Sequence, residues 1–256
     1  MNPMSLENKV VMITGAAQGI GRSIAEMAVE LGAKLMLVDM NAEKLDEVID
    51  ELGKDKARAY CGSVTDAGFV NTTVTDGVKT FGAIHALVNN AGIVQAAMVN
   101  KMEESQWDAV IEVNLKGAFL CLQAVGKHMI ESAKAGESAP GSIVNVSSDA
   151  GRRGTIGQIN YGAAKSGMLG LTMSAAREWG RYGIRVNSAC FGIIETEMTE
   201  TIRSEKFIDK YMAQIPMGRI ATSEEASKPV CFLISDAASY VTGQHLSING
   251  GYHIGF

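Results

Sequence analysis

The stretch VVMITGAAQGIG, residues 10–21, passes from an apolar run through a glycine-rich turn into an amphipathic segment. A turn of this kind, directly after a strand and at the start of a helix, is where a dinucleotide pyrophosphate binds in many α/β proteins. Gly15 permits the tight turn, Gly19 lets the backbone approach the phosphates, and Gly21 lets the helix pack closely on the strand. The helix N-terminus adds free N–H groups and a favourable dipole. Glycine-rich turns also occur without ligands, so the prediction depends on the position of this one after the first strand.

Strand-like and helix-like segments alternate along all 256 residues. Unbroken apolar runs suit strands of a parallel sheet that is buried on both faces, and their alternation with helices implies right-handed crossovers. We therefore predict an α/β fold, a single Rossmann-type doubly wound parallel sheet of about seven strands with helices on both faces, in one domain over residues 1–256. The predicted strands are 10–13, 35–38, 57–61, 84–88, 143–146, 184–189 and 244–248, and the predicted helices are 19–31, 42–52, 67–81, 105–130 and 158–181.

Two segments interrupt the alternation. Residues 131–141, ESAKAGESAPG, are small and polar and predict a loop between a helix and a strand. Residues 195–217 are rich in Thr, Glu and Met and follow a strand, where sheets of this type bind ligands. We interpret 195–217 as a substrate lid, with an ordinary packed pair of helices as the alternative.

The composition excludes several classes of function. The formal charge of −5 offers no basic face for nucleic acid, and no apolar run approaches the roughly 20 residues that span a bilayer. Residues 1–9 lack the apolar stretch of a signal peptide, so we expect a cytoplasmic protein. The cysteines are scattered without a CxxC motif or a nearby histidine cluster. They are therefore expected to be buried thiols rather than metal ligands: Cys61, Cys121, Cys190 and Cys231.

Asp39 ends the second predicted strand, 18 residues after Gly21. A carboxylate at this position accepts hydrogen bonds from the adenosine ribose and repels a 2′-phosphate. Gln18 and Met40, two positions that could carry a compensating cation, are neutral. We therefore predict that the cofactor is NAD(H) rather than NADP(H). Asp39 could also serve as the N-cap of the helix predicted over 42–52, a role compatible with ribose binding.

Tyr161 and Lys165 are four residues apart in a helical segment, so both side chains project from one face. A phenol with a pKa near 10 is a poor base at neutral pH, and a lysine cation close by lowers that pKa. Lowering it to about 7 takes roughly 4 kcal/mol of differential stabilisation. Such a tyrosine protonates a ketone oxygen in reduction and deprotonates an alcohol in oxidation. The pair alone is a weak signal, because helices also carry such pairs on solvated faces.

With these motifs in order, the chain resembles the short-chain dehydrogenase/reductase family over nearly its whole length, and most closely its 3-oxoacyl-[acyl-carrier-protein] reductase-like members. The residues that carry the resemblance are the motif at 14–21, Asn89-Asn90-Ala91-Gly92, Asn114, Ser148 thirteen residues before Tyr161, Lys165, and Thr196. The resemblance implies that Tyr161 is the acid/base and that Ser148 hydrogen-bonds the substrate oxygen. It also implies that Lys165 holds the nicotinamide ribose and that Asn114 positions a water joining Lys165 to solvent.

The motifs and the resemblance together define the expected site. The expected catalytic residues are Ser148, Tyr161, Lys165 and Asn114, and no metal ligands are expected. The expected cofactor-binding residues are Gly15, Gln18, Gly19, Ile20, Gly21, Asp39, Met40, Ser63, Val64, Asn90, Ala91, Gly92, Tyr161, Lys165, Gly192, Ile194 and Thr196. Two alternatives stay open: Ser147 lies next to Ser148, and Asn114 could be a helix-interior residue bonded to backbone.

The sequence departs from the family pattern at three places. Phe191-Gly192 stands where Pro-Gly is usual, so the turn beside the nicotinamide loses a fixed φ and gains an aromatic ring that could narrow the active site. Ser63-Val64 stands where Asp-Val commonly contacts adenine, which weakens that contact. The loop 131–141 is longer than is common.

By resemblance, we expect an NAD(H)-dependent oxidoreductase that acts on CH–OH groups of a small-molecule substrate, interconverting a 3-oxoacyl and a 3-hydroxyacyl thioester. Dehydrogenation of a free alkyl or aryl secondary alcohol is the alternative, and a non-catalytic dinucleotide sensor is a further one. Docking of an acidic carrier protein is disfavoured, because 131–140 is net acidic and Tyr182 stands where an arginine is common. Arg152 and Arg153 could face an anionic substrate group, but solvation is favoured. The resemblance also implies a homotetramer.

Overall fold

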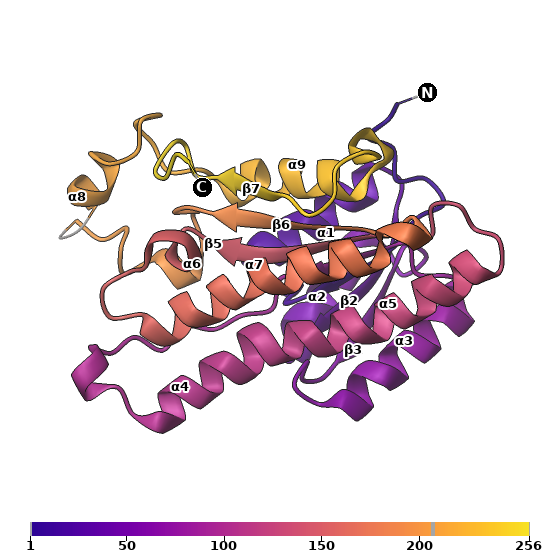
Figure 1. Cartoon of the computed structure of the whole chain (residues 1–256), viewed down its shortest axis with the longest axis horizontal. Coiled ribbons are helices and arrows are strands. Elements are labelled where there is room, and N and C mark those ends of the chain that lie inside the picture. Colours follow the sequence, from indigo (N-terminus) through magenta and orange to yellow (C-terminus); the bar gives the residue numbers. More distant parts are fainter. Residues whose placement is uncertain (1, 206–207, 256) are drawn as a thin grey trace.

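The strands of the computed structural model, which describes residues 2–205 and 208–255, form one fully parallel sheet. In this sheet the order is β3-β2-β1-β4-β5-β6-β7, so the chain moves outward from β1 in one direction and then restarts on its other side (Figure 1). The strands are β1 Val10–Thr14, β2 Lys34–Asp39, β3 Ala57–Cys61, β4 Ala86–Asn89, β5 Ser142–Ser148, β6 Arg185–Phe191 and β7 His245–Ile248. The predicted doubly wound sheet is confirmed.

Helices cover both faces of the sheet, as predicted (Figure 1). One face carries α1 Gly19–Glu30, α2 Ala42–Leu52 and α9 Ser223–Ile234. The other face carries α3 Ala67–Phe81, α5 Ala118–Lys134 and α7 Ile159–Trp179. Three shorter helices lie at the ends of the layers: α4 Glu104–Ile111, α6 Ala150–Arg153 and α8 Ile208–Met212.

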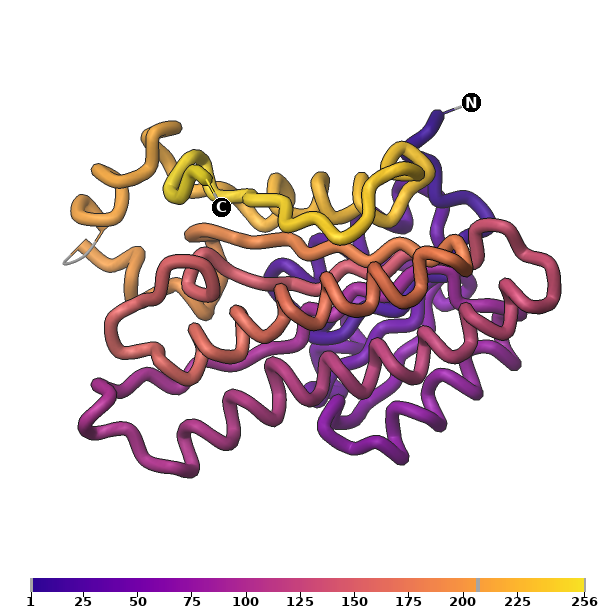
Figure 2. Tube along the Cα trace, in the orientation of Figure 1, coloured from indigo at the N-terminus to yellow at the C-terminus, as the bar shows by residue number. Residues whose placement is uncertain are grey.

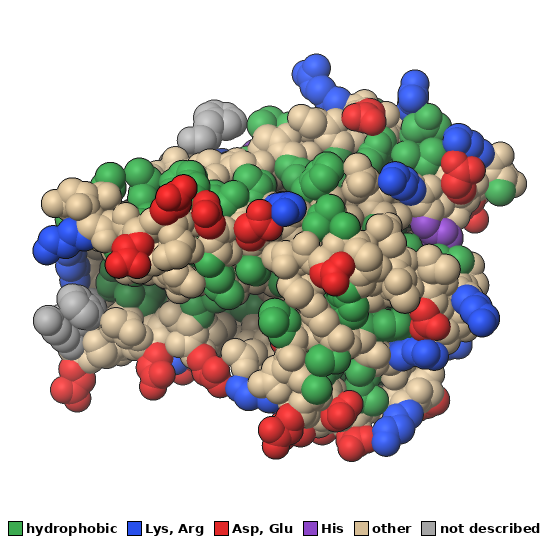
Figure 3. All heavy atoms as spheres, turned by 90° about the horizontal axis from the view of Figure 1, so that it is seen from below, with side chains coloured by type: hydrophobic (Ala, Val, Ile, Leu, Met, Phe, Trp, Pro, Cys, Tyr) green, Lys and Arg blue, Asp and Glu red, His purple; other side chains and the backbone are tan. Residues whose placement is uncertain are grey.

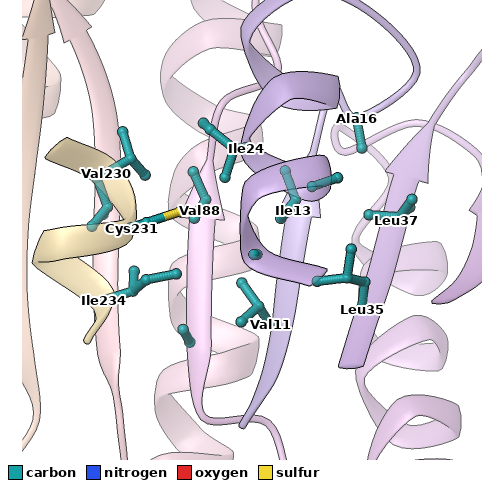
Figure 4. Packing of buried hydrophobic residues seen from close by; sticks show 14 of the residues in the cluster. Val11, Ile13, Ala16, Ile24, Leu35, Leu37, Val88, Val230, Cys231 and Ile234 are labelled. Atoms are coloured by element: carbon teal, nitrogen blue, oxygen red, sulfur yellow. The ribbon is translucent and has the colours of Figure 1, made fainter. Parts of the chain in front are cut away.

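The core is divided in two by the sheet, because successive strand residues point to opposite faces. Val11 and Ile13 of β1 join Leu35 and Leu37 of β2 under α1 and α9, where Cys231 also packs (Figure 4). The intervening residues, such as Met12 and Met36, join the core under α3, α5 and α7. Both sets are buried, which explains why these strands are unbroken apolar runs rather than alternating ones.

The helix predicted over 105–130 is one continuous helical run with an irregular middle. Between α4 and α5, residues Glu112–Gly117 form a π-helical turn. An inserted residue of this kind shifts the helical register, and such turns occur frequently at functional sites. Asn114 lies inside this turn and is fully buried.

Helix α9 is absent from the helices expected from sequence, and it contains Pro229. Proline removes one helical hydrogen bond and usually marks an end or a kink. The signal that could have identified this helix is the capping box at its start, where Thr222 and Glu225 bond reciprocally to backbone N–H groups. Its buried face packs against α1.

Three of the cysteines are buried as expected, but Cys61 is exposed. It ends β3, which is the edge strand of the sheet, and its thiol contacts the carbonyl of Met40. The expectation of a buried thiol was therefore wrong at this position, because an edge strand has a neighbour on one side only.

The helical run Glu104–Lys134 is long enough and apolar enough to cross a membrane by length and composition alone, although charged residues interrupt its apolar stretch. Half of its apolar window is buried inside the protein, which is ordinary for a core helix. On the face in Figure 3, acidic and basic side chains of the described residues are interspersed, without a continuous basic patch.

Two histidines accept backbone hydrogen bonds near the amino ends of β1 and β4. His85 Nδ1 accepts from Val10 N at 3.0 Å, and His128 Nε2 accepts from Ile84 N at 3.1 Å. Burial lowers the pKa of both imidazoles below the ordinary value of 6.5. A ring nitrogen that accepts must be unprotonated, so the fold holds both side chains neutral.

Because both folded pKa values lie below the unfolded value of 6.5, the unfolded chain takes up these protons first as the pH falls. We expect their contribution to stability to be complete above that pH and to be lost progressively below it. Thermal unfolding at about pH 7.5 and about pH 5.5 measures this loss. The variant H85N/H128Q keeps neutral acceptors, so its melting temperature should fall less between the two pH values. An equal fall in both proteins would contradict the assignment.

Candidate active site

The carboxyl ends of β1 and β4 are tied together by Thr14 and Asn90. Thr14 Oγ1 accepts from Asn90 N at 3.0 Å and from Ala91 N at 3.1 Å. In return, Asn90 Nδ2 donates to the carbonyl oxygens of Thr14 at 3.1 Å and of Gly15 at 2.9 Å. These two strands flank the point where the strand order reverses, which is where doubly wound sheets bind ligands. Thr14 was not among the expected site residues, although it begins the quoted glycine motif.

The three glycines of the turn are required for two different structural reasons. Gly15 and Gly19 have φ values of +65° and +57°, a region that other residues rarely adopt. A Cβ on Gly21 would lie 2.0 Å from the carbonyl oxygen of Gly15, so only glycine lets α1 begin this close to the turn. The result is a cradle with the N-terminus of α1 at its base, and it fits a pyrophosphate.

A cleft of about 720 Å³ extends from this cradle. Its lining contains twelve of the expected cofactor-binding residues: Gly15, Gln18, Gly19, Ile20, Asp39, Met40, Ser63, Val64, Asn90, Ala91, Gly92 and Thr196. Gly21, Tyr161, Lys165, Gly192 and Ile194 do not line it. Residues that were not expected but do line it include Asn41, Ile93, Val113 and Met198. An elongated cleft over a helix N-terminus is suited to a dinucleotide.

Asp39 braces the cradle. Its Oδ2 accepts from Ala17 N and its Oδ1 accepts from Asn41 N, each at 3.0 Å. The N-cap of α2 is Asn41, whose side chain accepts from Lys44 N, so the N-cap alternative for Asp39 was wrong. Each carboxylate oxygen has more than one acceptor site, so these bonds leave room for ribose hydroxyls.

The fold brings a cation to this end of the cleft that the sequence argument did not consider. Lys44 Nζ donates to Gln18 Oε1 at 2.5 Å and lies 3.3 Å from Glu197 Oε1. Gln18 Nε2 in turn donates to Glu197 Oε2 at 3.2 Å. The three side chains come from the glycine turn, from α2 and from the segment 195–217, so no single motif could have indicated the cluster. Glu197 partly neutralises the charge of Lys44.

The catalytic candidates lie where β5 ends and α7 begins. Ser148 is the last residue of β5, and its Oγ accepts from Ala150 N at 3.1 Å. The neighbouring Ser147 donates to the carbonyl of Lys165 at 2.8 Å and is buried, which leaves Ser148 as the hydroxyl beside Tyr161. Burial raises the pKa of the Tyr161 phenol to about 12, and a hydrogen bond with Ser148 acts in the opposite direction.

Lys165 is only 2% exposed. Its Nζ donates to the carbonyl of Val146 at 2.8 Å and lies 5.6 Å from the ring centroid of Tyr161. Burial lowers the pKa of this ammonium group to about 8. The expected lowering of the Tyr161 pKa by Lys165 is not seen: desolvation raises this pKa, and the group that acts in the lowering direction is the Ser148 hydroxyl.

Asn114 is held by the segment that follows β4. Its Oδ1 accepts from Ile93 N at 2.8 Å, and its Nδ2 donates to the carbonyl of Ile93 at 3.0 Å. The alternative of a backbone bond is thus realised, but across to another segment. A Cβ on Gly92 would lie 3.4 Å from Asn114 Oδ1 and 3.6 Å from Lys165 Nζ, so these three residues are neighbours.

Several surrounding residues differ from expectation. Phe191 is 4% exposed and packs in the core under α1 and α9, so it does not narrow the active site. Arg152 Nη1 donates to Ser247 Oγ at 2.6 Å, and Arg153 lies 3.6 Å above the ring centroid of Tyr252. Arg153 is exposed, as the favoured expectation of solvation requires, whereas Arg152 is partly buried against the C-terminal segment. In the described part of the chain, no group of three His, Cys, Asp or Glu side chains could hold a metal ion.

The fold and the similarity to known proteins are those of an oxidoreductase with a dinucleotide cofactor that acts on CH–OH groups. The sequence profile of the family described as enoyl-(acyl carrier protein) reductase matches residues 15–253. The chain belongs to the short-chain dehydrogenase/reductase family.

Particular relatives support the same class. The 3-oxoacyl-[acyl-carrier-protein] reductase FabG of Thermotoga maritima is 43% identical, over 97% of this chain and 99% of that protein. The FabG protein of Staphylococcus aureus is 37% identical, over 96% of this chain and 98% of that protein.

Two solved structures are also similar. A short-chain dehydrogenase/reductase from Brucella melitensis, described as a glucose/ribitol dehydrogenase, superimposes with a TM-score of 0.90 at 34% identity, over 97% of this chain and 98% of that one. A candidate 2-deoxy-D-gluconate 3-dehydrogenase from Agrobacterium tumefaciens, with bound NADP, gives 0.89 at 36% identity, over 98% and 99%.

The close approach at Gly21 yields a prediction. Gly21→Ala forces a Cβ against the Gly15 carbonyl, so the turn must open, and we expect NADH binding to weaken by at least about tenfold. Fluorescence titration with NADH measures this. Gly180→Ala is the matched control, because nothing lies within 4 Å of its Cβ and its φ is −55°. Equal NADH affinity in both variants would contradict the role of Gly21.

Proposed function

We propose that this protein is an NAD(H)-dependent oxidoreductase that interconverts a 3-oxoacyl thioester and the corresponding 3-hydroxyacyl thioester. The observation that carries the proposal is the position of Ser148 beside Tyr161, with Lys165 buried one turn further along α7. In this proposal Ser148, Tyr161, Lys165 and Asn114 are the catalytic residues. A nicotinamide dinucleotide bound in the cleft would supply or accept the hydride.

Tyr161 is suited to donate a proton. With a pKa of about 12 it is protonated at neutral pH, so in reduction its phenol can protonate the ketone oxygen. Ser148 is oriented by the Ala150 N–H, which leaves its own hydroxyl hydrogen free to bond to the same oxygen. The positive charge of Lys165 favours the phenolate that remains after transfer. In oxidation the same groups act in reverse, and the high pKa makes this direction faster as the pH rises.

The proposed preference for NAD(H) rests on Asp39. The carboxylate lines the cleft, and its bonds to the N–H groups of Ala17 and Asn41 keep it from turning away. A 2′-phosphate would meet this negative charge. Lys44, which could offset it, is shared with Glu197 and Gln18. One structural relative has bound NADP. The proposed preference for NAD(H) therefore rests on residues of this chain, and a direct comparison of the two cofactors tests it.

The test of cofactor preference compares NADH with NADPH. We expect kcat/KM to favour NADH by at least about tenfold, because 1.4 kcal/mol of charge repulsion suffices for that ratio. Asp39→Ala should remove most of the preference by lowering kcat/KM for NADH and raising it for NADPH. A wild-type preference for NADPH, or an Asp39→Ala variant with unchanged discrimination, would rule out the proposed role.

A second candidate substrate is a free secondary alcohol, alkyl or aryl. Relatives described as sugar dehydrogenases favour it. The surface on which a carrier protein would dock also favours a free substrate. There, Lys134 is paired with Glu131 at 2.7 Å, and Arg181 donates to Tyr182 Oη at 2.9 Å. The ion pair offsets the charge of Lys134, and Tyr182 supplies no charge of its own, so we propose a small-molecule thioester rather than a docked carrier protein.

The proposal also includes a lid, an assembly and a location. The segment 195–217 would act as the substrate lid, with α8 standing away from the sheet (Figure 1). Residues 206–207 of this segment lie outside the described part.

A homotetramer is proposed because three large apolar side chains are partly exposed on helices of one face: Trp107, Phe119 and Met173, at 37%, 42% and 47%. Light scattering measures the assembly directly, and a monomer would exclude it. We also propose a cytoplasmic location.

The decisive experiment measures initial rates of NADH oxidation with acetoacetyl-CoA and with a simple methyl ketone. Preferential turnover of the thioester is expected, and preference for the methyl ketone would assign the second candidate. Tyr161→Phe should lower kcat by roughly 10²–10⁴-fold, because it removes the proton donor, while NADH binding is retained. NADH binding by the wild type without turnover of either substrate would instead identify a non-catalytic sensor.

A further inference from the structure

The C-terminal turn, residues 249–253, is bonded to the segment that follows Ser148. Asn249 Nδ2 donates to Asp149 Oδ1 at 3.1 Å and Oδ2 at 2.9 Å, and also to the carbonyl of His253 at 3.0 Å. Asn249 Oδ1 accepts from Gly251 N at 3.0 Å. One amide side chain therefore shapes the turn and binds a carboxylate 100 residues away in sequence. Figure 2 shows the yellow C-terminal end beside the turn near residue 150.

Asp149 occupies a demanding position. Asp149 is only 3% exposed, and a buried carboxylate requires hydrogen-bond donors. It directly follows Ser148, and its own N–H donates to the carbonyl of Phe191 at 2.9 Å. The next N–H, of Ala150, is the one that orients Ser148 Oγ. A shift of Asp149 would therefore move the group that holds the Ser148 hydroxyl.

The same turn contacts two further walls of the site. A Cβ on Gly192 would lie 2.6 Å from the Cβ of Asn249, so Asn249 packs directly on the segment expected at the nicotinamide end. Met217, at the end of the lid segment, donates its N–H to the carbonyl of Gly250 at 3.1 Å. The turn 249–251 thus joins the Ser148 segment, the Gly192 segment and the end of the lid.

Helix α6 extends this connection to Tyr161 and Lys165. A Cβ on Gly151 would lie 2.5 Å from the carbonyl carbon of Lys165, so α6 packs backbone to backbone on the first turns of α7. On its outer side, α6 is held by Arg152 Nη2, which donates to the carbonyl of Gly255 at 3.2 Å, and by Arg153 over Tyr252. The catalytic residues lie on one side of α6 and the C-terminal segment on the other.

We propose that Asp149 and Asn249 are positioning residues. Their hydrogen bonds fix the Ser148 segment against the Gly192 segment and the end of the lid, so that Ser148 and Tyr161 meet the same substrate oxygen. This inference rests on the proposed function, because it assigns the pair a role in the reaction of that site. Neither residue lines the cleft.

The test uses Asp149→Ala and the exchange variant D149N/N249D in the full chain. Asp149→Ala should lower kcat with the better of the two ketone substrates by roughly ten- to a hundredfold, because misplacement by a fraction of an ångström affects the rate more than binding. The Kd for NADH should change by less than about threefold, because the glycine cradle and Asp39 are untouched. A third variant, N249D, places two carboxylates against each other. The exchange variant restores an amide facing a carboxylate, so its kcat should exceed that of N249D by at least about tenfold.

A matched control separates positioning from general loss of stability. Tyr60 lies on β3, at the opposite edge of the sheet from β7, and Tyr60→Phe removes its part-buried hydrogen bond to Asp76 of α3. It should lower the melting temperature without lowering kcat. The positioning role is overturned if Asp149→Ala keeps the wild-type kcat, if D149N/N249D is no faster than N249D, or if Tyr60→Phe loses as much activity as Asp149→Ala. An inactive wild type, in contrast, overturns the proposed function itself, and the positioning role with it.

Discussion

The structure depends on one close backbone contact, where the first turn of α1 meets the end of β1. Gly21 has no side chain, and the space that a Cβ would fill contains the carbonyl oxygen of Gly15. Asn90 reaches the same carbonyl from the end of β4 and closes the gap between the two strands. This contact sets the position of the α1 N-terminus, and with it the electrostatic environment of the cleft. The asymmetry of the sheet follows from the same place, since the strand order reverses between β1 and β4.

Burial determines the electrostatics of the catalytic end. It raises the pKa of Tyr161 to about 12 and lowers that of Lys165 to about 8, so at neutral pH the phenol is neutral and the lysine is still mostly charged. Lys165 is satisfied by the carbonyl of Val146 instead of a carboxylate. A phenol that stays protonated is a proton donor, and this suits ketone reduction at neutral pH.

Much of the fold was predictable because its signals are local. Unbroken apolar runs indicated strands buried on both faces, and the run Val10–Ile13 is buried on both faces as that pattern requires. The errors occurred where a residue's surroundings come from distant segments. Phe191 packs into the core, although its sequence neighbours placed it beside the active site. Lys44 contacts Gln18 because α2 begins soon after Asp39. Helix α9 continues past Pro229, and its packing against α1 stabilises it.

By itself, the sequence determined the class of fold, the glycine cradle, Asp39 at the end of β2, and the spacing of Ser148, Tyr161 and Lys165, because each depends on residue type and on distance along the chain. Only the tertiary structure decided which groups share one environment. It joined Lys44 to Glu197, placed Asn114 beside Gly92, and bonded Asn249 to Asp149 across 100 residues. The physical reason is that burial and hydrogen bonding depend on what surrounds a group in space, and for these side chains the surroundings are assembled from segments with no common sequence signal.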